Sequence, residues 1–185
     1  MSHREPPTLD APRASLRALS EADVPALLVI FSNAQVARYT SRPPFASEAD
    51  AVALLGRVQE GLRDQSAYQW GLARKSDDLV IGTCTLFQID RSNGRAELGY
   101  ALGREHWGQG HMAEALVALV AHGFFDLGLR RLEADVDPRN LPSIRSLERL
   151  GFEREGYLRE RWNVGGEIQD ALWYGLLARE WRARR

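Results

Sequence analysis

The sequence predicts a single domain of the α/β (α+β) class, in which helices flank a mainly antiparallel sheet. Three strand patterns, 67–75, 79–90 and 95–102, follow one another across short polar turns and so predict an antiparallel meander. Helical spacing of apolar residues occurs both before and after this meander. Of the 185 residues, 44% are hydrophobic and 26% are charged, which is enough for one core. We expect the domain to span 13–182, after a flexible arm over 1–12.

Two helices are expected between a first short strand, 15–19, and the meander. Ser20 is followed by acidic residues and then by apolar residues at helical spacing, which is the pattern of a helix cap. Ser47 stands in the same position before a second apolar pattern. Between the last two strands of the meander, the Asn93-Gly94 dipeptide predicts a tight hairpin.

The second half of the chain begins with a long apolar helix, from Met112 to roughly Leu127, and a strand over 131–136. Asn140 is a typical N-cap, and we expect a helix from there to Gly151, because glycine readily adopts the positive φ that ends helices. The last two strands flank a glycine turn and cover 152–163 and 167–178.

The turn before the long helix predicts an anion site. Gly108 and Gly110 allow backbone conformations and close approaches that a side chain would block. The first turn of a helix has amide N–H groups without partners, and such groups bind phosphates. A plain strand-to-helix connection without a ligand is the alternative. The residues that we expect to hold a phosphate-bearing ligand are Gly108, Gln109, Gly110, His111, Met112 and Ala113.

Composition argues against several classes of partner. The net charge of −1 gives no general attraction to nucleic acid or to an anionic membrane. Cys84 is the only cysteine and forms no zinc spacing with the four histidines, so no metal is expected. It lies in an apolar strand without a basic neighbour, which predicts a buried and inert thiol. No apolar run of about 18 residues occurs, and we expect a cytoplasmic protein.

Seven short motifs occur together in the order and spacing of one known group. They are Glu97-Leu98-Gly99-Tyr100, Trp107-Gly108-Gln109-Gly110, Arg131-Leu132-Glu133-Ala134, Asp137-Pro138-Arg139-Asn140, Ser143, Gly151-Phe152 and Glu155-Gly156. With these motifs the chain resembles the GNAT superfamily of acetyl-CoA-dependent N-acetyltransferases. Within it, the chain is similar to the branch of ribosomal-protein N-terminal (alanine/serine) acetyltransferases. The similarity runs from about Ser15 to Trp181.

The resemblance implies a mixed sheet that splays open between the strand ending near Leu102 and the strand 131–136. Acetyl-CoA, as cosubstrate, would lie in this opening, with its pyrophosphate on the amides of 108–113. The superfamily has Arg or Gln at the position of Trp107 and Gly or Ala at the position of Met112. Because phosphate contacts come mainly from the backbone, we expect these departures to leave binding intact. Further cosubstrate contacts are implied for Leu98, Gly99, Tyr100, Asn140 and Ser143.

Glu97 is the candidate general base. Amide formation needs a neutral amine, whereas an α-amino group has a pKa of about 7.7–8.0. Glu97 lies on the strand that borders the cosubstrate, and it would act directly or through a water molecule. A purely structural carboxylate is the alternative. Glu133, Asp135 and Asp137 alternate along the next strand and would attract a cationic acceptor.

Two candidates exist for the proton donor to the departing thiolate. Many superfamily members carry a tyrosine seven residues after the Asn, and this chain has Leu147 there. The Ser143 hydroxyl is the nearest replacement, and solvent is the alternative. Asn140 has a second explanation as a helix cap.

The acceptor is expected to be a primary amine, either a protein N-terminus, ribosomal or other, or a small molecule such as a polyamine or an antibiotic. The residues expected to contact it are Tyr39 and the loop 41–45, which joins the two early helices. A non-catalytic acyl-CoA sensor and a homodimer also stay open. Arg104, Arg139 and Arg145 are candidates for phosphate contact or solvated surface residues.

The turn also fits a dinucleotide-binding fingerprint, with glycines at 108 and 110 and alanine at 113. That fingerprint belongs after a buried parallel strand in a repeated strand–helix unit. Here an antiparallel meander comes first, which disfavours NAD as the ligand.

Overall fold

An eight-stranded sheet forms the centre of the computed structural model, which describes residues 5–40 and 42–183. The strands lie side by side in the order β1-β2-β3-β4-β5-β6-β8-β7. They are β1 (Leu9–Asp10), β2 (Ala14–Arg17), β3 (Tyr68–Arg74), β4 (Val80–Asp90), β5 (Arg95–Leu102), β6 (Arg131–Val136), β7 (Glu153–Val164) and β8 (Glu167–Leu177). The helices are α1 (Val24–Ser32), α2 (Ala34–Ala37), α3 (Glu48–Asp64), α4 (His111–Ala121), α5 (Leu141–Leu150) and α6 (Ala178–Ala183).

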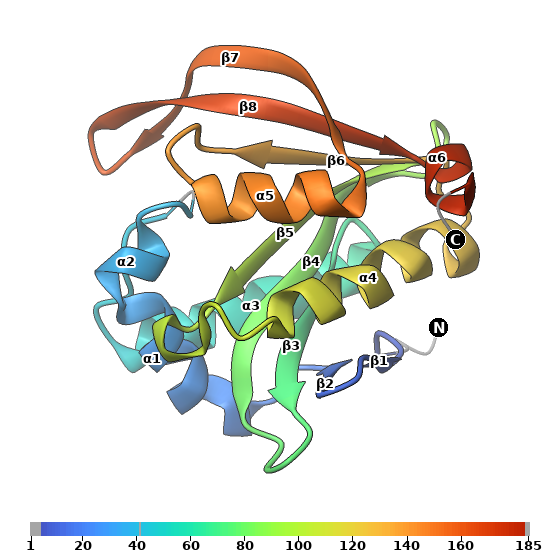
Figure 1. Ribbon diagram of the computed structural model, residues 1–185. Coiled ribbons are helices and arrows are strands. Elements are labelled where there is room, and N and C mark those ends of the chain that lie inside the picture. The colour runs from blue at the N-terminus through green and yellow to red at the C-terminus, as the bar shows by residue number, and fades with distance from the viewer. Residues whose placement is uncertain (1–4, 41, 184–185) are drawn as a thin grey trace.

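The predicted meander and the predicted splay are both confirmed. β3, β4 and β5 pair antiparallel in sequence order. β5 and β6 run parallel but pair only over Arg95–Glu97 and Arg131–Glu133. Beyond these residues the two strands diverge, which Figure 1 shows as an opening between β5 and β6. The backbone edges of 98–102 and 134–136 therefore face this opening without a strand partner.

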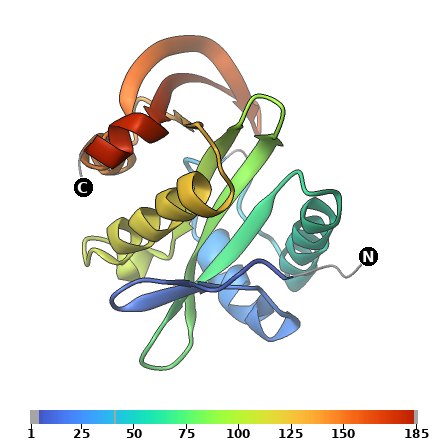
Figure 2. The ribbon, with the colours of Figure 1, turned by 90° about the vertical axis from the view of Figure 1, so that its right-hand side faces the viewer.

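Helices cover both faces of the sheet, as Figure 2 shows with α4 on one side of the meander and α1 and α3 on the other. The larger core lies under α4 and α5 and includes Leu98, Leu116 and Leu147. The second core lies between α1, α3 and the sheet, and it includes Leu27 and Leu54. In the part of the chain that is described, no helix is both long and apolar enough to cross a bilayer.

The predicted caps form as expected. Asp23 and Asp50 complete capping boxes with the serines three residues before them, at the starts of η1 (Glu21–Asp23) and α3. Asn140 accepts a hydrogen bond from the Ser143 backbone N–H at 3.3 Å at the start of α5. Gly151, with φ +95°, ends that helix.

The helices α2 and α6 were not predicted, and two predicted segments differ from the structure. The helix predicted to run unbroken to Leu127 changes at Ala121 into a π-helical turn, His122–Asp126, which contains a glycine and packs His122 against Trp70. Residues 5–12 of the predicted arm lie on the body, where β1 pairs with β2 and Trp70 donates to the Pro7 carbonyl at 2.8 Å. Residues 1–4 of that arm lie outside the described residues.

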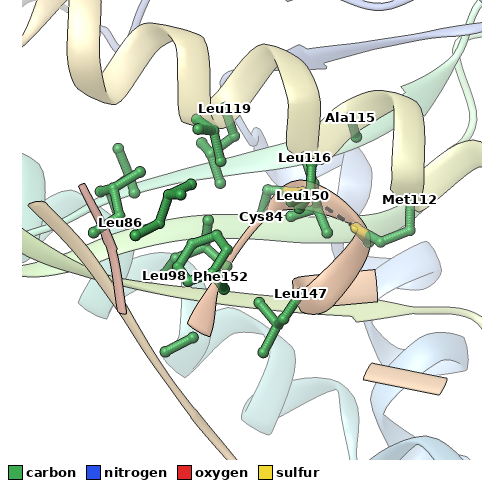
Figure 3. Close-up of a cluster of buried hydrophobic side chains, with 14 of the residues drawn as sticks. Cys84, Leu86, Leu98, Met112, Ala115, Leu116, Leu119, Leu147, Leu150 and Phe152 are labelled. Carbon is green, nitrogen blue, oxygen red and sulfur yellow. Dashed lines mark hydrogen bonds between the residues drawn. The ribbon is translucent and has the colours of Figure 1, made fainter. Parts of the chain in front are cut away.

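Cys84 is buried, as predicted. Its side chain is fully buried between β4 and α4, with Sγ 3.6 Å from the sulfur of Met112 (Figure 3). Burial raises the pKa of the thiol far above its ordinary value. The thiol is therefore unsuited to a covalent intermediate.

Candidate active site

A cavity of about 480 Å³ lies where β5 and β6 diverge. Its wall comes from the middle strands of the sheet, from α1, α3 and α5, and from the β7–β8 hairpin. It therefore collects side chains that are distant in sequence. The residues of the predicted site that line it are Glu97, Leu98, Gly99, Tyr100, Asn140 and Ser143.

Glu97 lies on the face of β5 that points toward α1 and α3, because alternate residues of a strand share a face. It is only 5% exposed. Burial raises its pKa, and the nearby charges of Glu133 and Asp135 act in the same direction. Within the described residues its carboxylate makes no hydrogen bond or ion pair, so the structure shows no partner that would explain it as a structural residue. A buried carboxylate with a raised pKa suits a proton acceptor near neutral pH.

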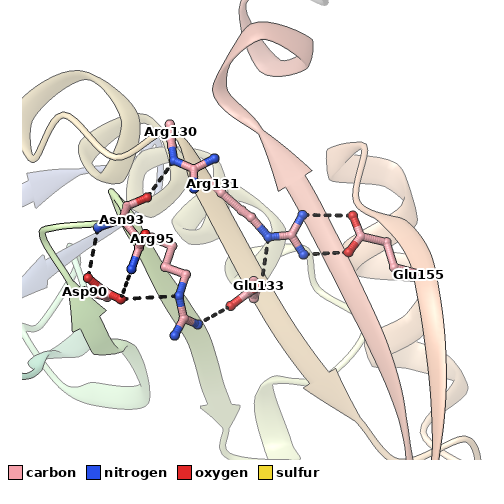
Figure 4. A network of polar contacts seen from close by, with 7 residues as sticks. All are labelled: Asp90, Asn93, Arg95, Arg130, Arg131, Glu133 and Glu155. Atoms are coloured by element: carbon pink, nitrogen blue, oxygen red, sulfur yellow. Dashed lines mark hydrogen bonds and ion pairs between the residues drawn. The ribbon is translucent and has the colours of Figure 1, made fainter.

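Glu133, predicted to add negative charge to the cleft, is neutralised by two arginines. Arg95 and Arg131 donate to its carboxylate at 2.9 and 2.8 Å, and Arg131 also pairs with Glu155 (Figure 4). This network fixes the pairing of β5 with β6 at the point just before they diverge. It therefore holds the backbone on which Glu97 sits.

Asp135 and Asp137 do line the cavity. Asp135 accepts a hydrogen bond from the Trp162 indole at 3.0 Å, and burial raises the pKa of its carboxyl. For Asp137 burial acts in the same sense, but hydrogen bonds from Arg139 outweigh it and lower the pKa below its usual range. Glu97 on β5, Asp135 on β6 and Asp137 directly after β6 thus form an acidic wall of the cavity. Arg161 lies 3.7 Å from the Asp135 carboxylate, and Arg139 pairs with Asp137, so this acidic charge is partly compensated.

The opposite face of β5 carries a pair of hydroxyl groups. The Tyr100 hydroxyl lies 2.6 Å from Oγ of Ser143, which is near the start of α5. Burial raises the pKa of Tyr100 to about 12, although the hydrogen bond with Ser143 acts against this. The sequence implied only a cosubstrate contact for Tyr100 and did not indicate this hydroxyl pair, because the two residues are 43 positions apart. The hydrogen bond between these two hydroxyl groups keeps a proton at the opening between β5 and β6.

Leu147 and Asn140 border the same pair. Leu147 lines the cavity and is 1% exposed, packed in the core under α5 (Figure 3). Asn140 acts as the helix cap that was its second explanation, and it also lines the cavity. The cap fixes the first turn of α5 and with it the position of Ser143.

The glycine turn lies at the end of β5, at the start of α4, and its residues are not part of the cavity wall. Gly108 and Gly110 have φ +73° and +86°, and a Cβ on Gly108 would meet nothing within 4 Å. The turn is held by Arg13, which donates to the Gln109 carbonyl at 2.7 Å and pairs with Glu114. No signal in the sequence indicated that Arg13 contacts the turn. Arg13 lies directly before β2, near the edge of the sheet.

The side chains after the turn point away from a ligand. Met112 packs on Cys84 in the core, His111 is 7% exposed, and Ala113 is small. The turn therefore offers backbone N–H groups rather than side chains. The open approach at Gly108 leaves room for a phosphate group, and the phosphate site itself stays a prediction.

The three arginines proposed for phosphates differ in their surroundings. Arg139 is held by Asp137 and Glu167, so its charge is already compensated. Arg104 donates to the Gln35 side chain and stacks on the ring of Trp107. Within the described residues Arg145 makes no ion pair, and it is exposed on α5.

Comparison with known proteins decides the family. Residues 13–153 match the family described as the acetyltransferase (GNAT) domain. The chain belongs to this family. It is 38% identical over 174 residues to the uncharacterised N-acetyltransferase p20 of Bacillus licheniformis, covering 94% of this chain and 98% of the relative.

Two further relatives agree. The ribosomal protein uS5-alanine N-acetyltransferase of Escherichia coli (strain K12) is 31% identical over 134 residues, or 72% of this chain and 69% of the relative. The solved structure of Mycobacterium smegmatis RimJ in complex with CoA-disulfide has the same fold, with a TM-score of 0.85 at 23% identity, covering 95% of this chain and 89% of the other.

As a GNAT enzyme, the chain is an N-acetyltransferase, and acetyl-CoA is its cosubstrate. The residues fit this molecule, because an unpaired strand edge over 98–102 leads toward an open glycine turn with free amide groups. Among the described residues no cluster of side chains suits a metal ion. Because the chain is an N-acetyltransferase that uses acetyl-CoA, the dinucleotide-binding and acyl-CoA-sensor alternatives are set aside.

Proposed function

We propose that this enzyme acetylates the N-terminal α-amine of a protein, with Glu97 as the general base. The observation that carries the proposal is the unpaired, buried carboxylate of Glu97 in a cavity that opens at the β5–β6 splay. The similarity to a uS5-alanine N-acetyltransferase supports a protein N-terminus as the acceptor. A cytoplasmic location and a homodimer stay predictions, to be checked by cell fractionation and size-exclusion chromatography.

We assign the two proton-handling groups to opposite faces of β5. When bound, acetyl-CoA supplies the acetyl group as a thioester. Glu97 takes the proton of the incoming amine, directly or through water, on the α1–α3 face. Tyr100, hydrogen-bonded to Ser143, holds a proton on the other face and stabilises the thiolate that departs. The acidic wall that includes Asp135 attracts the ammonium form of the acceptor.

A panel of acceptors tests this proposal. Purified enzyme and acetyl-CoA are incubated with peptides that begin with Ala or Ser, with the same peptides blocked at the N-terminus, with spermidine and with an aminoglycoside. Mass spectrometry of the products should show acetyl groups on the free α-amines alone. Acetylation confined to lysine side chains, spermidine or the aminoglycoside would contradict the proposed acceptor.

A further inference from the structure

The part of the cavity wall that α3 and the loop before it provide carries two arginines, one of which, Arg57, interacts with a carboxylate only through the more distant charge of Asp50. Arg42 comes from the loop before α3, and Arg57 lies on α3. Both line the cavity. Nη1 of Arg42 is buried and has no hydrogen-bond partner. In the described part of the chain neither guanidinium group forms an ion pair.

This arrangement is unfavourable for the empty enzyme. Arg57 is exposed, but Arg42 is partly buried, and the buried end of a cation without a partner loses hydration and gains nothing in return. Burial lowers the pKa of Arg42, and the charge of Arg57 acts in the same direction. Other arginines near the splay, such as Arg95 and Arg131, are fully engaged with carboxylates. Arg42 and Arg57 therefore form a site in the cavity wall that an anionic group could occupy.

The loop that carries Arg42 is anchored at both ends. The Thr40 hydroxyl donates to the Arg42 carbonyl at 3.1 Å. The Phe45 N–H donates to the Phe31 carbonyl at 3.0 Å, and the two aromatic rings pack with centroids 5.1 Å apart. The backbone that places Arg42 at the cavity wall is thus fixed.

We propose that Arg42 and Arg57 bind a carboxylate of the acceptor, several bonds from the amine that reacts. A guanidinium group forms paired hydrogen bonds with a carboxylate, which supplies the missing partner. The cavity then has an acidic wall for the amine and a basic wall for the carboxylate. On the proposed function, on which this inference rests, the acceptor is an N-terminal segment with an acidic residue close to its first residue. A polyamine, with positive charge only, is disfavoured.

Matched peptides test the preference. C-terminally amidated peptides with N-terminal Ala carry one Glu at position two, three or four, and each has a partner with Gln at that position. A dipeptide with a free C-terminal carboxylate separates a main-chain carboxylate from a side-chain one. For the parent enzyme, kcat/KM should favour the best Glu peptide over its Gln partner by about tenfold or more, mainly through KM.

Variants locate the origin of that preference. Arg42→Met and Arg57→Met should each reduce the Glu/Gln ratio of kcat/KM severalfold, whereas Arg63→Met should leave that ratio unchanged. Arg63→Met is the matched control, since Arg63 is exposed on the same helix and does not line the cavity. Titration calorimetry with the N-acetylated product peptides gives the same comparison without turnover. It also detects whether the variants are folded and able to bind.

The outcomes separate the two proposals. Equal acetylation of Glu and Gln peptides would overturn the carboxylate site and leave the proposed function standing. A Glu preference that survives in both arginine variants would also overturn it. A preference for the free dipeptide would support a carboxylate site but move its ligand to the main chain. If no peptide is acetylated but spermidine is, both proposals fail.

Discussion

The glycine turn and the cavity are two halves of one site, yet they are built in different ways. The turn uses backbone from one short stretch, 107–113, in which His111 and Met112 are buried, and Trp107 and Gln109 donate their side-chain N–H groups to nearby backbone carbonyls. The cavity uses side chains from residues as far apart as Phe31 and Asp170. Backbone amides suit a ligand that all members of a family share, whereas side chains suit an acceptor that differs between enzymes. Substitutions in the turn should therefore change the affinity for acetyl-CoA, and substitutions in the cavity should change the rate of acetyl transfer.

The largest effect should come from a charge in the turn. Gly110→Glu places a side chain at φ +86°, where its Cβ would lie 2.9 Å from Nη2 of Arg13, and adds a negative charge beside the expected phosphates. Calorimetry should show acetyl-CoA affinity lowered by about 100-fold or more. Gly128→Glu is the control, because Gly128 has φ +67° in open space away from the site. A folded Gly110→Glu enzyme with normal affinity would show that the turn is only a connector.

The hydroxyl pair should give the next largest effect, now on chemistry. Tyr100→Phe and Ser143→Ala should each slow the single-turnover rate by about 10–100-fold, since a hydrogen bond to a developing thiolate is lost. The double variant should be little slower than the worse single one, because the two groups act together. Tyr174→Phe, which removes a hydroxyl bonded to Glu148, serves as the control. Unchanged single-turnover rates would leave solvent as the proton donor.

A smaller effect is expected from the residue that holds the turn. Arg13→Gln removes the bond to the Gln109 carbonyl and the pair with Glu114. Because these contacts are exposed, acetyl-CoA binding should weaken by only about 2–10-fold, with kcat preserved. Arg91→Gln, which loses an exposed contact with the Tyr68 hydroxyl, is the matched control. A fall in kcat at saturating acetyl-CoA would contradict the division between the two halves.

The smallest effect concerns stability. The pKa of Glu97 is raised by burial above the ordinary value of 4.5, so the folded protein holds this proton more tightly than the unfolded chain does. The free energy of unfolding of the parent therefore falls as pH rises through that raised pKa. Glu97→Gln lacks the ionisable group and does not show this fall. The melting temperature of the variant minus that of the parent should increase from about pH 4 to pH 8. A constant difference across that range would show that Glu97 ionises at no cost.

The same contrast explains how far the sequence could be read. The turn, the meander and the caps at Ser20, Ser47 and Asn140 depend on residues that are neighbours in the chain, and all were predicted. The turn, the meander and the caps need only local geometry and periodicity. Placement of Glu97 beside the splay also needed the resemblance to the GNAT superfamily, which implied the splay.

What the sequence could not show depends on pairs brought together by folding. Tyr100 and Ser143 meet across 43 positions, and Glu133 loses its free charge to arginines on two strands. Arg139 was proposed for phosphate, and its pairing with Glu167 across 28 positions was not visible. No spacing rule connects such residues, so their partners had to be seen in three dimensions.

The pH dependence of acetyl transfer by the parent and by Glu97→Gln tests the central claim most directly. Single-turnover rates with an N-terminal Ala peptide are measured from about pH 6 to pH 9, which spans the usual α-amine pKa. The variant should be slower by about 10²–10⁴-fold near pH 7, with unchanged acetyl-CoA affinity, and the gap should narrow as the amine loses its proton unaided. Superimposable profiles would contradict the account and assign Glu97 a structural role.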